Sequence, residues 1–551
     1  MKKFITVVSL LILSFHGNSQ TVGLIQHDAQ SLDNGYILFA PIGATATYLI
    51  DKCGKLAKTW PSNYRPGQSV YLLPDGTLLR TGNANNATFN AGGKGGIIEK
   101  IDWDGHVVWT YQVSDATKCQ HHDVKALPNG NVLIIAWESK TNTEAIAAGR
   151  NPAQVSNQLW SEQILEVQPV GTNGGNVVWE WHLWDHLVQD FDDAKPNYGT
   201  VATNPQLINL NYNANANQSD WIHLNSIDYN ATLDQIVVSS HNMSEIWIID
   251  HSTTTAEAAT HAGGNSGKGG DILYRWGNPT AYDMGTNSNR HFYGQHNARW
   301  IESGYPFENQ IMVYNNGNGR QGGNYTTVEI INPPVDGYNY SNTLPYLPTT
   351  TSWIYNDGNP NNYYAQNISG AQQLPNGNVL MCNGPAGTFT EVTNSGETVW
   401  KYISPINGMG IISQNSPANQ NLVFRCTYYP YDYAGFSGHS ITSGDIIENQ
   451  NDVSATCELT SGLVTINPDF NVSIFPNPSS DFMAVQLQGL LTEKVDVKLF
   501  DQSGKMLKET SIQPGSTLCY LDTQTLYSGT YLVTYFISGR LVGSDQVVLV
   551  K

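Results

Sequence analysis

The sequence predicts an all-β chain, a six-bladed β-propeller followed by a small C-terminal β-sandwich. Two repeated phrases support this prediction, because each marks strands at recurring intervals along the chain. Composition supports it too, since 51 glycines and 40% hydrophobic residues occur in 551 residues with few long helical patterns.

The first repeated phrase is typical of a β-hairpin. It reads LPDGTLL from Leu73, LPNGNVLI from Leu127 and LPNGNVLM from Leu374. Looser copies begin at Leu32, Leu233 and Glu308. In each copy a turn built on Asn, Asp or Gly joins two strands.

The second phrase predicts an outer strand that ends in aromatic residues. Its copies are GKLAKTW at Gly54, GHVVWTY at Gly105, GNVVWEW at Gly175, GDILYRW at Gly270, TSWIYND at Thr351 and GETVWKY at Gly396. Because the aromatic residues recur in every unit, we expect them to pack between blades and not to stack on a substrate.

Together the phrases define five complete units, at about 69–112, 121–183, 222–277, 295–356 and 369–404. A copy at 32–61 supplies only three strands. The lone strand at 421–429 is expected to complete it, so that strands from both ends of the domain (21–447) close the ring and remove exposed sheet edges. Polar insertions at 184–219 and 332–350 are expected to form loops over one face.

The first 20 residues, MKKFITVVSLLILSFHGNSQ, predict a secretory signal peptide, with two lysines, an apolar run and a small polar end. Cleavage is expected near Ser19 or Gln20. No later stretch approaches the roughly 20 apolar residues that span a bilayer, so we expect no transmembrane segment.

The charge disfavours two classes of partner. The formal net charge is −19, and loss of Lys2 and Lys3 with the signal peptide makes it −21, which argues against nucleic acid and anionic membranes. The six cysteines have no CxxC spacing, so neither a cysteine metal site nor a disulfide-dense scaffold is indicated, and one or two disulfides remain possible.

The repeat stops near Asn449. After a linker at 448–467, residues 468–551 predict a seven-stranded β-sandwich. The PNP at Pro476, LYSGTYLV at Leu526 and the terminal VVLVK resemble the type A C-terminal sorting domain of the type IX secretion system of Bacteroidota. The resemblance implies that the type IX machinery is a partner and that the protein is released or anchored at the cell surface.

Candidate site residues gather where inner strands begin. Those strands begin with HHD (His121–Asp123), HLN (His223–Asn225), QHN (Gln295–Asn297) and SGAQ (Ser369–Gln372). Second strands return to the same end, where His241 and Arg320 follow them. Imidazoles, amides and a guanidinium at one channel mouth suit a tetrahedral oxyanion.

Two other interpretations stay open at this point. Each histidine can simply bind neighbouring backbone, although three in register make that less favoured. Three histidines can also bind zinc, and Asp123 beside His122 is a candidate carboxylate for orienting a ring.

Long phrases, among them HHDVKALPNGNVLIIAWE and DWIHLNSIDYN, resemble the bacterial arylsulfate sulfotransferase family. The resemblance implies a six-bladed propeller that moves a sulfuryl group from an aryl sulfate donor to a phenolic acceptor through a sulfohistidine, with no nucleotide donor and no cofactor. By motif, His296 is the nucleophile, His122, His223 and Asn225 hold sulfuryl oxygens, and Ser369 is the hydroxyl of the fifth blade.

The chain departs from this family at His241, which takes the place of an arginine. An imidazole with a pKa of about 6.5 is only partly cationic at neutrality, so KM is expected to rise between about pH 6 and 8 unless Arg320 supplies a permanent charge. His122, or its neighbour His121, is expected to protonate the leaving oxygen. A non-catalytic secreted binding propeller and a zinc-dependent hydrolase or sulfatase remain as alternatives.

Overall fold

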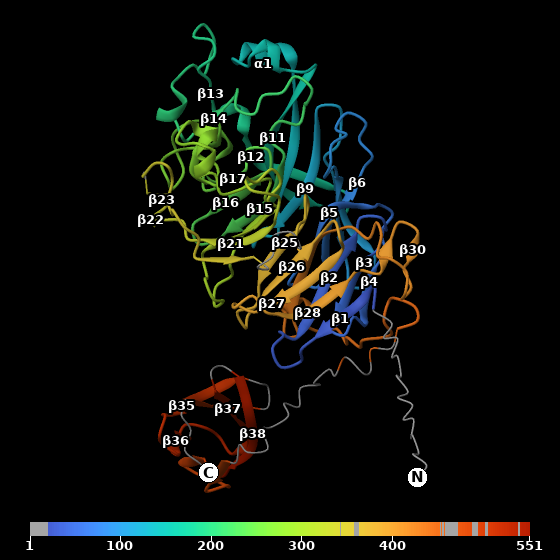
Figure 1. Cartoon of the computed structure of the whole chain (residues 1–551). Helices are drawn as coiled ribbons and strands as arrows, with labels where there is room; N and C mark the ends of the chain where they lie inside the picture. The colour runs from blue at the N-terminus through green and yellow to red at the C-terminus, as the bar shows by residue number, and fades with distance from the viewer. Residues whose placement is uncertain are drawn as a thin grey trace, which may run out of the picture. The chain divides into compact units, whose positions relative to one another are not determined.

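The computed structural model describes residues 20–341, 343–356, 363–451, 453, 457, 472–487, 494–501, 505–537 and 540–551. The predicted signal peptide lies outside these residues, apart from Gln20. The chain divides into two compact units, Met1–Cys457 and Glu458–Lys551, which are described separately (Figure 1).

The described part of the first unit contains six sheets of four or five strands, one for each predicted repeat. The first three contain β2 (Gly35–Pro41), β3 (Thr47–Asp51), β4 (Leu56–Trp60) and β31 (Val423–Pro430); β5 (Pro66–Leu72), β6 (Leu78–Asn83), β7 (Gly96–Ile101) and β8 (Val107–Gln112); and β9 (Lys118–Ala126), β10 (Val132–Thr141), β11 (Gln158–Val170) and β12 (Gly174–His182).

The other three contain β15 (Leu224–Asn230), β16 (Gln235–Ser240), β17 (Glu245–Asp250) and β18 (Ile272–Trp276); β19 (His296–Trp300), β20 (Ile311–Asn315), β21 (Thr327–Ile331) and β24 (Trp353–Tyr355); and β25 (Gly370–Gln373), β26 (Val379–Asn383), β27 (Thr388–Val392), β28 (Thr398–Ile403) and β1 (Gly23–His27).

The inner strands form a closed ring. Neighbours in space run β31, β5, β9, β15, β19, β25 and back to β31. The expected closure by the strand at 421–429 is present, because β31 pairs antiparallel with β2, with Tyr36 opposite Tyr429. The fold is therefore a β-propeller whose first sheet combines strands from the two ends of the unit.

The repeated hairpin phrase folds the same way at each clear copy. The amide of Leu73, Leu127 or Leu374 donates to the carbonyl oxygen four residues later, at 2.8 Å in all three. The turn glycines, Gly76, Gly130 and Gly377, have φ of 82°, 86° and 92°, a region in which a side chain is strained. The Asn-Gly or Asp-Gly in each phrase is thus required by turn geometry.

The tryptophans of the outer strands link each sheet to the next. Their indole nitrogens donate to backbone oxygens of the following repeat: Trp60 to Asp102, Trp109 to Gly174, Trp181 to Gly270, Trp276 to Pro348, Trp353 to Asn394 and Trp400 to Lys52. The last bond returns to the first repeat. The prediction that these aromatic residues pack between repeats is confirmed.

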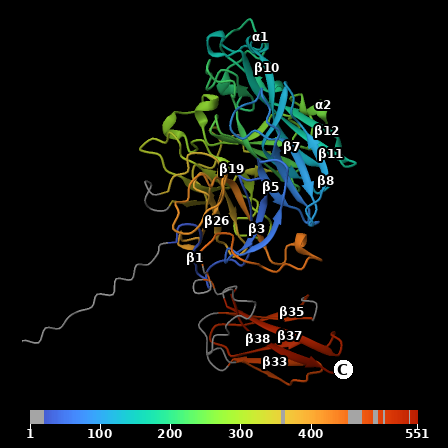
Figure 2. The same ribbon diagram turned by 90° about the vertical axis from the view of Figure 1, so that its right-hand side faces the viewer.

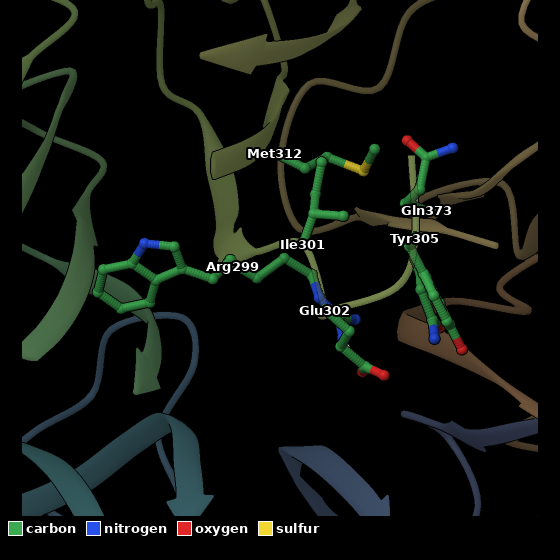
Figure 3. A pocket seen from close by; sticks show the side chains of 8 residues that line it. Arg299, Ile301, Glu302, Tyr305, Met312 and Gln373 are labelled. Carbon is green, nitrogen blue, oxygen red and sulfur yellow. The ribbon is translucent and has the colours of Figure 1, made fainter. Parts of the chain in front are cut away.

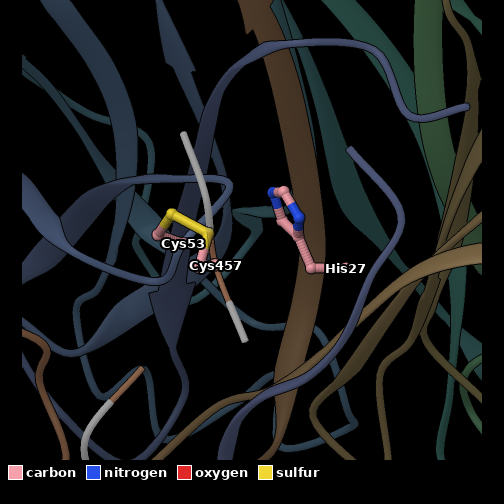
Figure 4. A group of neighbouring side chains, drawn as sticks. All are labelled: His27, Cys53 and Cys457. Carbon is pink, nitrogen blue, oxygen red and sulfur yellow. A yellow bond between two sulfur atoms is a disulfide. The ribbon is translucent and has the colours of Figure 1, made fainter. Parts of the chain in front are cut away.

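Two features at the start of the domain were not predicted. Strand β1 pairs with β28 and so adds a fifth strand at the outer edge of its sheet. A disulfide joins Cys53 to Cys457, 404 residues apart in sequence, close to His27 (Figure 4). It attaches the end of the first unit to the loop after β3.

The insertions contain short elements. They are α1 (Asn142–Ala147), η1 (Pro152–Gln154), η2 (Leu183–Asp185), β13 (Leu187–Val188), η3 (Val201–Thr203), β14 (Ile208–Asn209), α2 (Thr255–Ala258), η4 (Pro279–Tyr282), η5 (Asn287–Asn289), β22 (Val335–Asp336), β23 (Asn339–Tyr340), β29 (Ile406–Asn407), β30 (Gly410–Ile411) and η6 (Ala434–Phe436). Both α1 and α2 begin with a capping box, formed by Thr141 with Glu144 and by Thr254 with Glu257.

The C-terminal unit (red in Figure 2) has seven described strands in two sheets. One contains β32 (Val472–Phe475), β33 (Phe482–Leu487) and β36 (Leu518–Asp522); the other contains β34 (Val495–Phe500), β35 (Met506–Ile512), β37 (Gly529–Ile537) and β38 (Arg540–Leu549). Side chains of both sheets, such as Val485 and Val533, share one apolar cluster.

Candidate functional site

The candidate site lies near the starts of β15 and β19 and in the middle of β9, which begins at Lys118 and not at His121 as predicted. There the backbone is left-handed at His122, His223 and Asn297, with φ of 50°, 56° and 54°. The pairing register of β9, β15 and β19 also shifts at these places. Left-handed non-glycine residues cost of order 1–3 kcal/mol, and bulges re-aim side chains. The backbone therefore departs from regular strand geometry where the candidate residues lie.

Four predicted histidines form a continuous series of ring contacts. The ring centroids of His122 and His223 are 4.6 Å apart, those of His223 and His241 are 5.3 Å apart, and those of His241 and His296 are 5.5 Å apart. His122 and His296 are each 2% exposed. The structure thus brings together residues from three sheets that the sequence separates by up to 174 positions.

The tautomer of His296 is fixed by Asn316, which the sequence analysis did not single out. The Asn316 amide nitrogen donates to the carbonyl oxygens of Ala365 and Ile368 at 2.7 and 3.0 Å. Its Oδ1 therefore accepts, and lies 2.8 Å from Nδ1 of His296. Nδ1 must carry the hydrogen, so Nε2 holds the lone pair. Burial, with a smaller contribution from the charge of His241, lowers the pKa of His296 well below 6.5, which keeps that lone pair free.

His223 has the opposite electrostatic setting. Its Nδ1 lies 2.5 Å from Oδ2 of Asp220, whose Oδ1 accepts from the Trp137 indole. Burial lowers the pKa of His223, but the Asp220 carboxylate outweighs burial and the net shift is upward from 6.5. His223 is the cationic member of the series, with Nε2–H left for a ligand.

His122 is connected to a buried carboxyl group through His121. Nδ1 of His122 lies 2.9 Å from Nδ1 of His121, and Nε2 of His121 lies 2.8 Å from Oε2 of Glu162. Glu162 also accepts from the amide of Leu224 at 3.0 Å. Burial raises the pKa of Glu162 well above 4.5 and lowers the pKa of both histidines well below 6.5.

Two arrangements of hydrogens satisfy the line of contacts from Glu162 through His121 to His122. When Glu162 is protonated it donates to His121, His121 donates to His122, and Nε2 of His122 carries a hydrogen. When Glu162 is ionised, Nε2–H of His121 donates to Glu162 and Nδ1–H of His122 donates to Nδ1 of His121. Nε2 of His122 then carries a lone pair. Burial disfavours an imidazolium at either His121 or His122 and favours a protonated Glu162. The expectation that His122 or His121 protonates the leaving oxygen stays a prediction, with Glu162 as the group that stores the proton.

Arg425, on the closing strand β31, was also missed. Its Nη1 lies 2.6 Å from Oδ2 of Asp123 and 3.0 Å from the Tyr71 hydroxyl, and its Nη2 donates to the Asn225 carbonyl at 2.7 Å. Asp123, the carboxylate considered for orienting a metal-binding ring, is thus engaged by Arg425. The sequence marked this strand for closing the ring, and nothing in its pattern distinguished Arg425.

The remaining predicted residues are in different settings. Asn225 is buried and donates to the Gln295 carbonyl at 2.7 Å, while its Oδ1 has no partner. Ser369 is buried and accepts from the Gly384 amide at 3.0 Å. The guanidinium of Arg320 lies over the rings of Tyr325 and Tyr293, at 4.3 and 5.3 Å from their centroids. Among its described contacts none joins Arg320 to the four histidines, so the structure does not bring it into the series.

His241 needs a correction. Burial, followed by the charge of His223, lowers its pKa to about 4, so His241 is neutral from pH 6 to 8. Burial of this side chain argues against the expected dependence of KM on its protonation in that range. His223 carries the positive charge instead.

A cavity of about 550 Å³ lies at the other ends of the inner strands. Asp123 and Arg425 line it, together with the charged residues Lys125, Asp228 and Arg299. A small void of about 10 Å³, at the lower limit of the space that holds one water molecule, is lined by Arg299, Ile301 and Gln373 among others (Figure 3). Asp123 and Asn297, which directly follow His122 and His296 in sequence, both line the larger cavity.

Within the described residues, two groups have three metal-ligating side chains with close ligand atoms. They are His27 with Cys53 and Cys457, and His186 with His261 and Asp271. The first contains the disulfide, whose sulfurs are not thiolates. The four channel histidines do not form such a group.

Comparison with solved structures finds distant similarity. A protein of unknown function from Bacteroides caccae is 12% identical, with 72% of this chain and 99% of that chain covered and a TM-score of 0.40. Virginiamycin B lyase from Staphylococcus aureus is 12% identical, with 71% of this chain and 87% of that chain covered and a TM-score of 0.33. The β-propeller domain of a Myceliophteria thermophila protein is 8% identical, with 71% of this chain and 87% of that chain covered and a TM-score of 0.33. Scores this low say nothing about function. Comparison with curated proteins found no match.

Family models identify both parts of the chain. Residues 473–548 match the model described as a secretion system C-terminal sorting domain, which indicates a secreted or cell-surface protein, as predicted. In the described residues no helix has the length and apolarity to cross a membrane. Residues 22–429 match the arylsulfotransferase model, and the chain therefore belongs to the arylsulfotransferase family.

Proposed function

We propose that this protein transfers a sulfuryl group from an aryl sulfate to a phenolic acceptor through a sulfohistidine at His296, without a nucleotide donor or cofactor. The observation that carries the proposal is the tautomer of His296. A buried imidazole with Nδ1–H held by Asn316 and an unprotonated Nε2 is arranged as a nucleophile.

In the first half-reaction, Nε2 of His296 attacks sulfur and the bond from sulfur to the aryl oxygen breaks. The electron pair of that bond goes to the departing phenolate. The Nδ1–H bond to Asn316 stabilises the positive charge that develops on the imidazole. In the second half-reaction, the acceptor oxygen attacks sulfur, the N–S bond breaks, and its electron pair returns to Nε2.

The line from Glu162 through His121 to His122 supplies and recovers the proton. With Glu162 protonated, Nε2–H of His122 donates to the leaving phenolate as one hydrogen moves along each bond of the line. The reverse shift takes the hydrogen of the acceptor phenol back to Glu162. Neither histidine has to become an imidazolium, which suits their burial.

The sulfuryl oxygens are assigned to the donors that surround His296. His223 offers Nε2–H with a positive charge supported by Asp220, and Asn225 retains one amide hydrogen beyond the one given to Gln295. His241 and Ser369 are assigned contacts with the sulfuryl group as uncharged side chains. Fixed donors in a water-poor site stabilise charge as it develops.

One assay distinguishes this function from the alternatives. The purified protein is given 4-nitrophenyl sulfate with and without an added phenol, and the released phenol and any sulfated acceptor are measured. A sulfotransferase requires the acceptor, a sulfatase releases the phenol without it, and a binding propeller releases nothing.

Mass analysis after quenching with donor alone tests the covalent step. One added sulfo group on the peptide that contains His296 is expected. Turnover by unmodified protein would contradict the sulfohistidine while leaving a transferase possible by direct displacement.

A further inference from the structure

A second group of potential metal ligands lies away from the channel, where the segment after β12 meets the loop before β18. The ligand atoms of His186, His261 and Asp271 all lie within 4.8 Å of one another. Nδ1 of His186 and Nδ1 of His261 are 2.9 and 2.7 Å from the same Oδ1 of Asp271. The proposed sulfuryl transfer uses none of these residues.

The proton arrangement of His186 is unusual. Its Nε2 lies 2.8 Å from the carbonyl oxygen of Ala258, and a carbonyl only accepts, so Nε2 carries a hydrogen. In a neutral ring Nδ1 then holds a lone pair, and that lone pair faces a carboxylate oxygen at 2.9 Å. Two acceptors this close need a hydrogen or a metal ion between them, and a metal ion satisfies both without protonating either group.

The surroundings resemble those of a metal-binding histidine. Ligating histidines usually donate their other ring N–H to a backbone carbonyl or carboxylate, which orients the ring, and Ala258 provides this contact. The His186 ring is fully buried and stacks on Trp181, with centroids 5.6 Å apart and planes 4° apart. Trp181 in turn donates to the Gly270 carbonyl at 2.7 Å. The position of Nδ1 is therefore fixed by the stack on Trp181 and by the contact with Ala258.

The loop that carries the other two ligands is also closely held. A Cβ at Gly270 would lie 2.0 Å from the Ala258 carbonyl oxygen, so only glycine permits this approach. The side chain of Asp271 is 7% exposed, whereas that of His261 is 63% exposed. An ion can therefore reach the two buried ligands from solvent on the side of His261.

We propose that His186, His261 and Asp271 bind one divalent transition-metal ion of the Zn²⁺ class. Two imidazole nitrogens and one carboxylate oxygen are ligands that Zn²⁺ takes in proteins, and water can complete its coordination. The ion would replace the hydrogen bonds to Asp271. It would connect the beginning of the 184–219 insertion, where His186 lies, to the loop at 259–271. Its role would be structural.

Lys268 is the competing cation in this loop. Burial lowers the pKa of Lys268, and the charge of Asp271 partly opposes this lowering, which places the two groups within electrostatic range. A metal ion beside Asp271 would be repelled by this ammonium group. Removing it is expected to strengthen metal binding.

The test uses the full-length secreted protein without a histidine tag, stripped with chelator and then dialysed against Zn²⁺ alone. Bound zinc per chain is measured by elemental analysis, and the dissociation constant by calorimetry. The variants are His261→Ala, Lys268→Met and, as a matched control, His106→Ala. His106 also pairs with an aspartate, Asp102, at 3.2 Å, and its side chain is 77% exposed.

We expect His261→Ala to bind one zinc fewer than the wild type, or to bind it at least about tenfold more weakly, and Lys268→Met to bind more tightly. Zn²⁺ should raise the Tm of the wild type and not that of His261→Ala. His106→Ala should behave as the wild type. Equal zinc binding by wild type and His261→Ala, or none by either, would overturn the proposal and leave an imidazolium–carboxylate ion pair only.

Discussion

The two ends of the inner strands differ in how they hold polar groups. At the strand starts, His223 and His296 are each bound through one ring nitrogen, by Asp220 and Asn316, and the backbone there is left-handed or bulged. At the other ends charges are paired directly, as Lys125 is with Asp228 at 2.6 Å.

The difference shows how a site becomes reactive. In an ion pair each charge is neutralised by the other, and a partly exposed pair contributes only about 0–1 kcal/mol to stability. An imidazole held through one nitrogen keeps the other for a ligand, and its partner decides whether that nitrogen is a donor or a lone pair. Polar side chains thus keep a free ring nitrogen at one end of the strands and are paired with one another at the other end.

The strongest test of this contrast replaces His296, the proposed nucleophile. His296→Ala is expected to lower kcat/KM for sulfuryl transfer by about 10⁴-fold or more and to abolish sulfo-enzyme formation, because Nε2 is lost. Lys125→Met at the cavity end is the matched control and should remain active. Loss of activity in both, with intact circular dichroism, would contradict the distinction between the ends.

The next largest effect is expected from Glu162→Gln. The amide can donate to His121 but cannot give up its hydrogen, so kcat should fall by about 10²-fold or more. The loss should be greater for aryl sulfates with poorer leaving groups, which a structural role would not produce. Glu166→Gln is the control on the same strand, since Glu166 binds His251 at 3.0 Å, away from the four histidines. An equal loss for all leaving groups would remove the proton line from the mechanism.

Asp220→Asn tests the charge of His223. Below its raised pKa His223 is cationic and binds the anionic sulfate ester; as pH climbs through that pKa the charge is lost and KM rises. In Asp220→Asn burial acts unopposed, so His223 should be neutral throughout. We expect KM to increase about tenfold near neutrality and to vary little with pH. A wild-type KM profile retained by the variant would exclude this assignment.

His241→Arg introduces a permanent charge beside His223. Because the pKa of His241 is about 4, the wild-type residue supplies no charge at pH 6 to 8. One new charge-assisted hydrogen bond of about 1.5 kcal/mol would lower KM by roughly tenfold. Space is limited, since a Cβ at Gly294 would lie 2.9 Å from Nε2 of His241. His241→Gln is the neutral control and should change KM little; an unchanged KM in His241→Arg would show that the ester does not contact this position.

The smallest effect is expected from removing residues 458–551, because β31 already closes the ring and Cys457 keeps its disulfide with Cys53. Activity of the purified protein should change by less than about twofold, while secretion is lost. A cut before Cys457 should lower stability by about 2–5 kcal/mol, the usual effect of losing a disulfide. Misfolding after a cut at 457 would contradict the independence of the first unit.

Much of the architecture could be predicted from local pattern. The Leu-Pro-x-Gly phrases defined hairpins because only glycine suits their turns, and the recurring tryptophans marked contacts between repeats. Strand β1 was missed because five residues at a sheet edge carry little periodicity. The disulfide between Cys53 and Cys457 was left open, since pairing across 404 positions depends on which chain ends meet.

The sequence by itself determined the β-propeller class, the secretion tail and the register that brings His122, His223 and His296 to one end, because repeats and motifs are local. Only the tertiary structure decided the protonation of the site. Glu162 and Arg425 come from other strands and Asn316 is the residue after β20, and burial lowers the pKa of His241 to about 4. Hydrogen-bond partners and desolvation depend on neighbours in space, which no single stretch of the chain specifies.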